Sequence, residues 1–232
     1  MSRLLFASAF SLVVAAAAAA PAQAQGERAP GMYGVVRAGA ALDSDLKLKK
    51  ADVAAPATVR RDEDFKPGFT GEVGAGYDSG GFRLEGTVGY SNAELDQKRA
   101  AVTGFTSDGR AKALTLGLAG YADIPTGSAV TPYVGGGIGA TRVDARFSRI
   151  GGMPAASSRF AGKDWGFQWH LDAGVGIRAA ANTTVELGAR YTQVSALDYK
   201  GFSGPVGTGA VADGFKPKLA STSVLLGLRQ LF

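Results

Sequence analysis

His170 is the only histidine in this 232-residue sequence, and Asp172 lies two residues after it. An imidazole can act as a general base in catalysis, but no nucleophile forms a recognisable pair with this one. A metal site is equally unsupported, because one histidine in a chain without cysteine gives no ligand spacing. We therefore expect no catalytic residues, no metal site and no enzyme activity. We interpret His170 as a partner in an internal polar network.

Three pairs of glycines, each pair separated by one residue, are a second candidate for chemistry. They are Gly74 and Gly76, Gly135 and Gly137, and Gly174 and Gly176. A glycine-rich phosphate cradle needs a turn from a strand into a helix, whereas these glycines lie inside segments with a strand pattern. Glycine inside a strand permits close backbone approach or sharp curvature. We therefore expect no bound cofactor.

The third candidate is a set of charged residues on the polar faces of strand-like segments. Its members are Glu72, Arg83, Glu85, Asp172, Arg178, Glu186, Arg190 and Arg229. Charged side chains are tolerated in a protein interior when they are paired. Because both signs are present, we expect these residues to form one network of arginine and carboxylate groups if their segments enclose a common interior.

The segments that carry these charges have the two-residue period of β-strands. In 167–178 every odd position is apolar, and the even positions hold glycine or polar residues. A similar alternation runs through 82–90 and 184–192. Successive side chains of a strand point to opposite faces, so each segment has one apolar and one polar face.

A soluble sandwich and a membrane barrel both explain this alternation, and three features favour the barrel. The segments are about 9–11 residues long, enough to cross a bilayer at a tilt. Aromatic residues lie near the segment ends, as in the interfacial girdles of outer-membrane barrels. Short connections at 78–81, 124–129 and 179–183 alternate with long polar ones at 43–67, 91–111, 143–165 and 193–219.

The predicted fold is all-β: a closed, antiparallel, up-and-down transmembrane barrel of eight strands with short periplasmic turns and long extracellular loops. We expect strands at 32–42, 68–77, 81–90, 112–122, 131–142, 166–178, 184–192 and 220–232. The first, fourth and fifth are rich in glycine and alanine, so their facing is not decided by the pattern. Side chains can just fill the interior of such a barrel, which favours a charge network that closes the cylinder over a gated, charge-lined pore.

Residues 1–24 have the order of a secretory signal peptide. Arg3 gives a cationic start, residues 4–20 are almost entirely apolar, and Ala22-Gln23-Ala24 forms the cleavage pattern. The alternative, an N-terminal membrane anchor, fits less well because a spanning helix needs about 20 apolar residues. We predict cleavage after Ala24, export through the periplasm, and a single outer-membrane barrel domain at 25–232.

The composition argues against other classes of protein. The chain has 34 glycines and only 19% charged residues, below the roughly 25% of ordinary soluble proteins. Its formal net charge of +5 is spread along the sequence and does not form the clustered patch that nucleic-acid binding requires. We expect no nucleic-acid partner.

The C-terminus carries a candidate assembly signal. Val224, Leu226, Leu228 and Phe232 lie at alternating positions counted back from the end, and the chain ends on an aromatic residue. This resembles the terminal signal that the barrel-assembly machinery reads. Gln230 departs from the resemblance, because that position is usually apolar or aromatic. The alternative is an ordinary last strand that ends in phenylalanine.

Two further segments carry a family resemblance. Residues 131–139 resemble the fifth strand, and 185–191 the seventh, of the small opacity-type and OmpA-type barrels of Proteobacteria. The resemblance covers nearly all of 25–232 and implies this fold and a location in the cell outer membrane. It also implies no single activity, because members include adhesins, immune-evasion proteins and envelope-integrity proteins. We expect no peptidoglycan-binding domain, unlike longer OmpA-type proteins. Lipid A deacylase barrels have a serine two residues after their histidine, where this chain has Asp172.

We therefore expect a structural or surface-interaction role, with loops that contact a host, neighbouring cells or lipopolysaccharide. The connection around 144–164 is the most cationic: Arg146, Arg149, Arg159 and Lys163 stand against two acids and could touch lipopolysaccharide phosphates. A narrow porin-like channel for small solutes or ions is the alternative, and a lipid-modifying membrane enzyme is a weaker one. The expected partners are outer-membrane lipid, lipopolysaccharide, the barrel-assembly machinery and a loop ligand on a host or cell surface.

Overall fold

The computed structural model describes residues 30–47, 62–64, 67–94, 108–148, 160–197 and 218–232. The predicted signal segment, 1–24, lies outside these residues. The described chain forms the strands β1 (Gly31–Lys47), β2 (Asp62–Asp64), β3 (Gly68–Asp78), β4 (Phe82–Glu94), β5 (Asp108–Asp123), β6 (Val130–Ser148), β7 (Phe160–Arg178), β8 (Thr183–Ser195) and β9 (Lys218–Leu231). None of these ranges contains a helix long and apolar enough to span a membrane.

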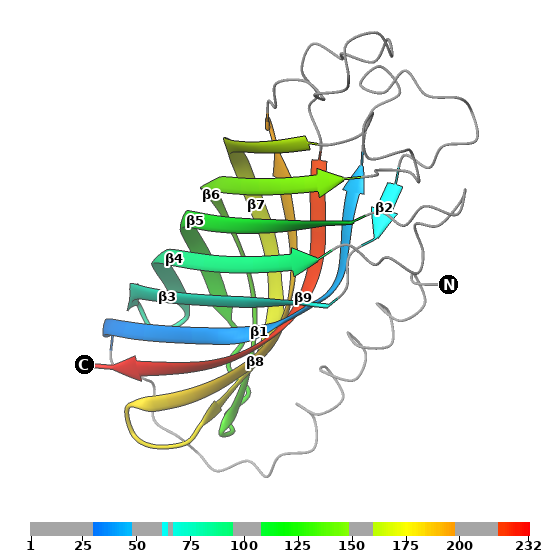
Figure 1. Ribbon diagram of the computed structural model, residues 1–232. Coiled ribbons are helices and arrows are strands. Elements are labelled where there is room, and N and C mark those ends of the chain that lie inside the picture. The colour runs from blue at the N-terminus through cyan, green and yellow to red at the C-terminus, as the bar shows by residue number, and fades with distance from the viewer. Residues whose placement is uncertain (1–29, 48–61, 65–66, 95–107, 149–159, 198–217) are drawn as a thin grey trace, which may run out of the picture.

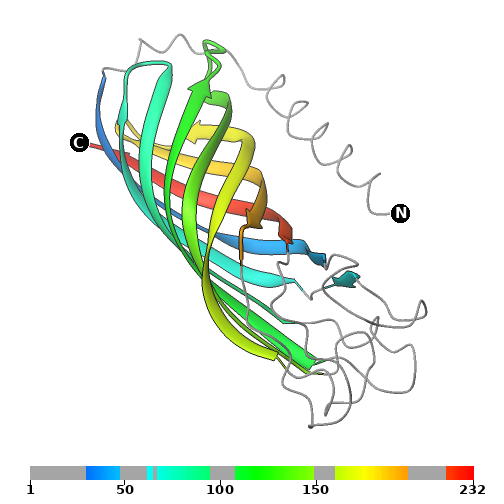
Figure 2. The same cartoon turned by 90° about the horizontal axis from the view of Figure 1, so that it is seen from above.

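Eight of the strands form a closed barrel (Figures 1 and 2). Each pairs antiparallel with the next in the order β1, β3, β4, β5, β6, β7, β8, β9, and β9 pairs with β1 to close the cylinder. The three-residue β2 only extends the sheet at Asp45–Lys47 of β1. The prediction of a closed, antiparallel, up-and-down barrel of eight strands is therefore confirmed.

Three short connections lie at one end of the barrel, which we call the turn end; the opposite end is the loop end. In the turn after β3, the backbone nitrogen of Ser79 donates to the carbonyl of Phe82 at 2.9 Å. Gly80 there has a φ of 95°, and Gly127 in the turn after β5 has a φ of 67°. Glycine adopts this left-handed region without steric penalty, which explains its place in both turns.

The strands of the barrel are longer than the sequence pattern predicts, and most of the extra length is at the loop end. β5 begins at Asp108 instead of 112, β6 ends at Ser148 instead of 142, and β7 begins at Phe160 instead of 166. Charged side chains take outward positions in these extensions, among them Arg110, Arg146 and Lys163. Backbone pairing does not need an apolar outer face, so the sheet continues beyond the level at which lipid would contact it.

The structure also settles the facing of the three strands rich in glycine and alanine. On β1, Val36 is 56% exposed on the outer wall while the next residue, Arg37, is 4% exposed in the lumen. On β5 the outward row is Leu114, Leu116 and Leu118, and on β6 it includes Ile138. These three strands therefore also place large apolar side chains on the outer wall, as β4, β7 and β8 do.

This register makes a prediction for β8. Leu187 is 43% exposed on the outer wall, with Val175 and Leu226 as its partners on the flanking strands. Leu187→Arg would place a cation in the hydrocarbon region, and we expect it to lower the free energy of unfolding by about 2–4 kcal/mol. Urea unfolding in lipid vesicles measures this change.

The control for Leu187→Arg is Gln193→Arg, because Gln193 has the same outward parity nearer the loop end, opposite Trp169. It should change the free energy of unfolding by only about 0–1 kcal/mol. Equal effects of the two substitutions would mean that the register of β8 in the membrane is wrong.

Candidate functional site in the barrel lumen

Ion pairs fill the turn-side part of the lumen and form what we call the luminal network. Its members come from seven of the eight barrel strands. They are Arg37, Glu72, Asp78, Arg83, Glu85, Asp123, Asp172, Glu186, Arg190 and Arg229. The inward positions of an antiparallel barrel converge on one axis, so residues far apart in sequence meet here.

Arg37 contacts three carboxylates of this network. It lies on β1, and its guanidinium contacts Glu72 at 2.8 Å, Glu85 at 2.5 Å and Glu186 at 3.0 Å. The pair with Glu85 is bidentate, because Nη2 also donates to Oε2 at 2.9 Å. Paired, charge-assisted hydrogen bonds of this kind are among the stronger polar interactions in proteins, so β1 is held to β3, β4 and β8 across the lumen.

Glu186 is the carboxylate of the luminal network that forms ion pairs with the most arginines. It lies on β8, is 1% exposed, and contacts Arg37 at 3.0 Å, Arg83 at 3.1 Å and Arg229 at 3.0 Å. Arg83 continues to Asp123 at 2.8 Å, and Arg229 continues to Asp78 at 3.0 Å. Removing this one carboxylate would leave three arginines with one anionic partner fewer.

Arg190 lies at the side of the luminal network that is nearer the loop end. It contacts Glu72 at 2.6 Å and Asp172 at 2.7 Å, and both contacts involve two guanidinium nitrogens. The hydroxyl of Tyr121 donates to Asp172 at 3.0 Å. The guanidinium of Arg190 is therefore bracketed between two carboxylates and presents little free charge to the space above it.

Tyrosine rings fill the space between the arginines. The guanidinium carbon of Arg83 lies 4.7 Å from the centre of the Tyr121 ring and 5.2 Å from that of Tyr133, within the range of cation–π attraction. The two rings meet edge to face, with centres 6.0 Å apart. A Cβ on Gly188 would overlap the Tyr133 hydroxyl, so glycine on β8 makes room for this ring. Ions and rings together close the turn-side lumen.

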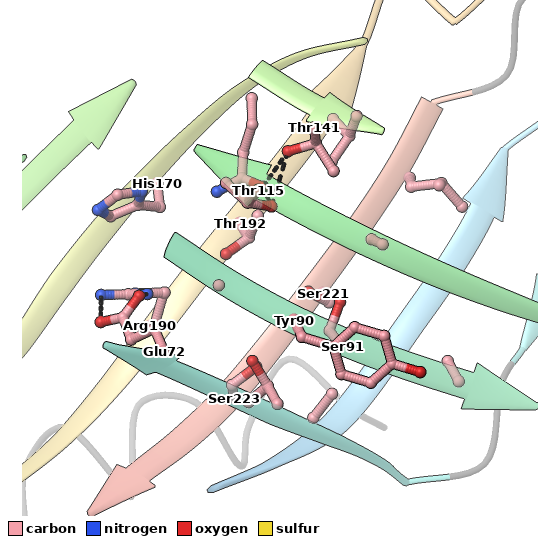
Figure 3. A pocket seen from close by; sticks show the side chains of 18 of the residues that line it. Glu72, Tyr90, Ser91, Thr115, Thr141, His170, Arg190, Thr192, Ser221 and Ser223 are labelled. Atoms are coloured by element: carbon pink, nitrogen blue, oxygen red, sulfur yellow. Dashed lines mark hydrogen bonds and ion pairs between the residues drawn. The ribbon is translucent and has the colours of Figure 1, made fainter. Parts of the chain in front are cut away.

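The loop-side part of the lumen is not closed in this way. It contains a cavity of about 120 Å³, here called the loop-side cavity. Figure 3 shows the Arg190–Glu72 pair on one side of it and His170 nearby, with Thr115, Thr141, Thr192, Ser221 and Ser223 from the surrounding strands. Small and hydroxylated side chains leave this space because they do not reach the barrel axis.

His170 lines the loop-side cavity and is itself 4% exposed. Neither ring nitrogen has a hydrogen-bond partner among the described residues. The nearest carboxylate is Asp172, whose Oδ2 lies 3.8 Å from Nε2. The ring packs against Gly137 of β6, where a Cβ would come within 2.6 Å of the ring carbon Cε1. Glycine at position 137 therefore allows the imidazole to lie this close to the backbone of β6.

A second candidate site lies on the outer wall at the loop end. The β5–β7 basic cluster consists of Arg110, Lys112, Arg142, Arg146 and Lys163 on the outward faces of three adjacent strands. Asp144 is the acid between them, 3.2 Å from Lys163 and 3.7 Å from Arg146. The predicted loop cations Arg149 and Arg159 lie outside the described residues.

The sequence matches a family model over residues 10–210, and that model describes the outer membrane protein β-barrel domain. The chain belongs to this family. Members of the outer membrane protein β-barrel family are placed by their fold in the outer membrane, and this protein is an outer-membrane barrel.

Solved structures of outer-membrane barrels share the fold of this family member. Neisserial surface protein A is 18% identical, with a TM-score of 0.50 over 87% of this chain and 99% of its own. OprG of Pseudomonas aeruginosa is 16% identical, with a TM-score of 0.54 over 90% of this chain and 99% of its own. No curated protein sequence matches. At these identities the likeness is one of fold and gives no activity.

Most of the charged residues predicted to line the lumen meet there. The structure joins Glu72, Arg83, Glu85, Asp172, Glu186, Arg190 and Arg229 in the luminal network. Arg178, at the turn end of β7, forms no ion pair with a described residue; its backbone nitrogen donates to the carbonyl of Ala129 at 2.9 Å. His170 borders the network without a hydrogen bond to it.

Sequence reasoning missed three charged members and the tyrosines. Arg37 lies on β1, whose small residues gave no facing, although Tyr33 and Val35 at the same parity are buried with it. Asp78 belongs to the predicted connection at 78–81, and Asp123 lies between the predicted strand at 112–122 and the predicted connection at 124–129. Their strand parity would have placed both in the lumen, because Asp78 pairs with Arg83 and Asp123 lies two residues after Tyr121.

Proposed function

We propose that this barrel is a surface-interaction protein whose β5–β7 basic cluster holds the phosphate groups of lipopolysaccharide. The observation that carries the proposal is the position of the cluster directly above an apolar wall. Arg142 of β6 lies between Leu114 of β5 and Trp165 of β7, and Phe167 and Leu116 continue the exposed apolar surface toward the turn end. Lipid phosphates would occupy the level at which this surface ends.

The charge arrangement within the cluster also favours an anionic ligand. Arg110 and Arg146 are directly opposite each other on β5 and β6, and like charges in that position destabilise a sheet. Glu94 of β4 lies opposite Arg110, and Asp144 lies 3.7 Å from Arg146, so each arginine has one acid beside it. A phosphate group between the two arginines would offset the repulsion that remains. Arginine suits this role because its planar guanidinium can bind two phosphate oxygens at once.

A lipopolysaccharide-binding test follows from the cluster. Arg142→Gln/Arg146→Gln should reduce the stabilisation that lipopolysaccharide gives the barrel, because each cation near an anionic membrane surface contributes roughly 1 kcal/mol. We expect a loss of about 2 kcal/mol in the difference between unfolding free energies in vesicles with and without lipopolysaccharide, and a smaller loss at high salt.

The charge-preserving pair Arg142→Lys/Arg146→Lys is the matched control, and it should keep most of the stabilisation. Vesicles of phosphatidylcholine alone show whether either pair affects folding itself. If lipopolysaccharide stabilises the glutamine pair as much as the unmodified barrel, the cluster does not hold its phosphates and the loops must supply any surface interaction.

We propose further that the barrel-insertion machinery recognises the C-terminal assembly signal, which consists of Val224, Leu226, Leu228 and Phe232. Val224, Leu226 and Leu228 are exposed on the outer wall of β9, and Phe232 is exposed beyond them at the turn end. The backbone nitrogen of Phe232 donates to the carbonyl of Met32 at 3.0 Å, so the last residue is attached to the first strand at the seam where the barrel closes.

A further inference from the structure

The wall of the loop-side cavity has hydrogen-bonding groups that the described chain leaves unused. Both nitrogens of His170 lack a partner, and the ring is almost completely buried. The hydroxyls of Thr192, Ser221 and Ser223 also line the cavity without a hydrogen bond to another described side chain. Buried polar groups are nearly always satisfied by protein, water or ligand, so this wall is suited to a polar occupant.

The charge of the cavity wall indicates what kind of polar occupant fits. Among the described residues its ionised members are Arg190 and Glu72, which are bonded to each other through two contacts of 2.6 Å and 3.0 Å. An anion or a cation would have to lose its hydration without gaining a free counter-charge, which is costly. A neutral molecule rich in hydroxyl groups has no such penalty and can both donate to and accept from this wall.

The size of the cavity sets a further limit. One water needs a cavity of roughly 10–15 Å³. The 120 Å³ of the loop-side cavity therefore holds on the order of ten waters or one compact molecule. Thr115, Thr141 and Gln168 line the cavity but are hydrogen-bonded to one another. The lining groups without a side-chain partner among the described residues include His170 of β7, Thr192 of β8, and Ser221 and Ser223 of β9. A ligand with several hydroxyl groups can bond to this set, because the three strands are neighbours in the barrel.

We propose that the loop-side cavity is a binding site for a small, neutral, polyhydroxylated molecule of monosaccharide size, with His170 hydrogen-bonding one of its hydroxyl groups. The Arg190–Glu72 pair forms one polar side of the site, and Gln168 and the hydroxylated side chains complete it. This site is separate from the β5–β7 basic cluster, which faces outward on the opposite side of the barrel wall.

The single histidine makes the proposal directly testable. The full-length barrel, folded in detergent micelles with isotope-labelled histidine, gives one set of imidazole NMR signals. Titration with glucose should shift these signals along a saturable curve, whereas titration with acetate or with methylammonium should not.

Two alanine substitutions of the same size distinguish binding in the cavity from other effects. Ala113 lines the cavity, so Ala113→Leu should remove the saturable shift. Ala140 is exposed on the outer wall, so Ala140→Leu should leave it unchanged. The proposal is overturned if glucose gives no saturable shift, since the cavity then holds water only. It is also overturned if Ala113→Leu keeps the shift or if a charged probe replaces glucose as the ligand.

Discussion

Replacing Glu186 with alanine is expected to lower the free energy of unfolding of this barrel by about 3–5 kcal/mol, the usual effect of removing one partner of a buried ion pair. Glu186 is almost completely buried and is shared by Arg37, Arg83 and Arg229. Its loss leaves three guanidinium groups close together with less negative charge among them. The total is a large part of the stability of an ordinary domain.

Urea unfolding in lipid vesicles measures this loss of unfolding free energy, and two further variants serve as its controls. Glu94→Ala removes an exposed carboxylate at the loop end of β4, and it should change the free energy of unfolding by no more than about 0.5 kcal/mol. Glu186→Gln keeps a hydrogen-bond acceptor and should fall between the two. A loss below 1 kcal/mol for Glu186→Ala would show that the luminal network relaxes around the vacancy and does not depend on this carboxylate.

The fold could be predicted from the sequence because lipid and lumen impose opposite chemistry on alternate residues. β4, β7 and β8 carry large apolar side chains outward and charged or small ones inward, so their period is visible in the printed sequence. The turn-end connections are equally plain, because a short connection between antiparallel strands leaves few residues out of the pattern. Strand number, topology and location followed from these features.

The sequence could not predict which side chains of a strand face the lumen when both faces of that strand carry small residues. β1 reads Val36-Arg37-Ala38-Gly39-Ala40, and alanine or glycine is compatible with either lipid or lumen. Arg37 was therefore left out of the predicted network, although its partners Glu72, Glu85 and Glu186 were included. Those partners are 35, 48 and 149 residues away in the chain. Glu72 lies directly opposite Arg37 on the neighbouring strand β3, whereas Glu186 on β8 comes within reach because β9 closes the barrel against β1.

The loop-side cavity could not be predicted for a related reason. The sequence places serine, threonine and alanine on inward faces, but whether they leave space depends on what crosses the axis from the opposite strands. At the turn end long arginine side chains cross it, and at the level of Thr115, Thr141 and Ser221 no arginine of the described strands does. A cavity is a property of several strands together, so no single segment could indicate it.

Purified protein in planar bilayers should show no steady conductance, because the interior of an eight-stranded barrel is just wide enough to be filled by side chains. Here the arginines of β1, β4, β8 and β9 reach carboxylates on other strands, and Tyr121 and Tyr133 occupy the space between them. Moving an ion through would require separating several buried pairs at once.

Glu85→Ala/Glu186→Ala should convert this silent barrel into one with small, unstable openings, because it removes two of the three carboxylates that hold Arg37 and leaves only Glu72. Tyr121→Ala opens the same level of the lumen without changing its charge, and it serves if the double variant does not fold. Gln193→Ala, outside the lumen, should remain silent. Large, stable, ion-selective channels in the unmodified protein would contradict the closed lumen. The charges of the luminal network would then be the lining that selects ions, and a narrow channel would replace surface interaction as the proposed function.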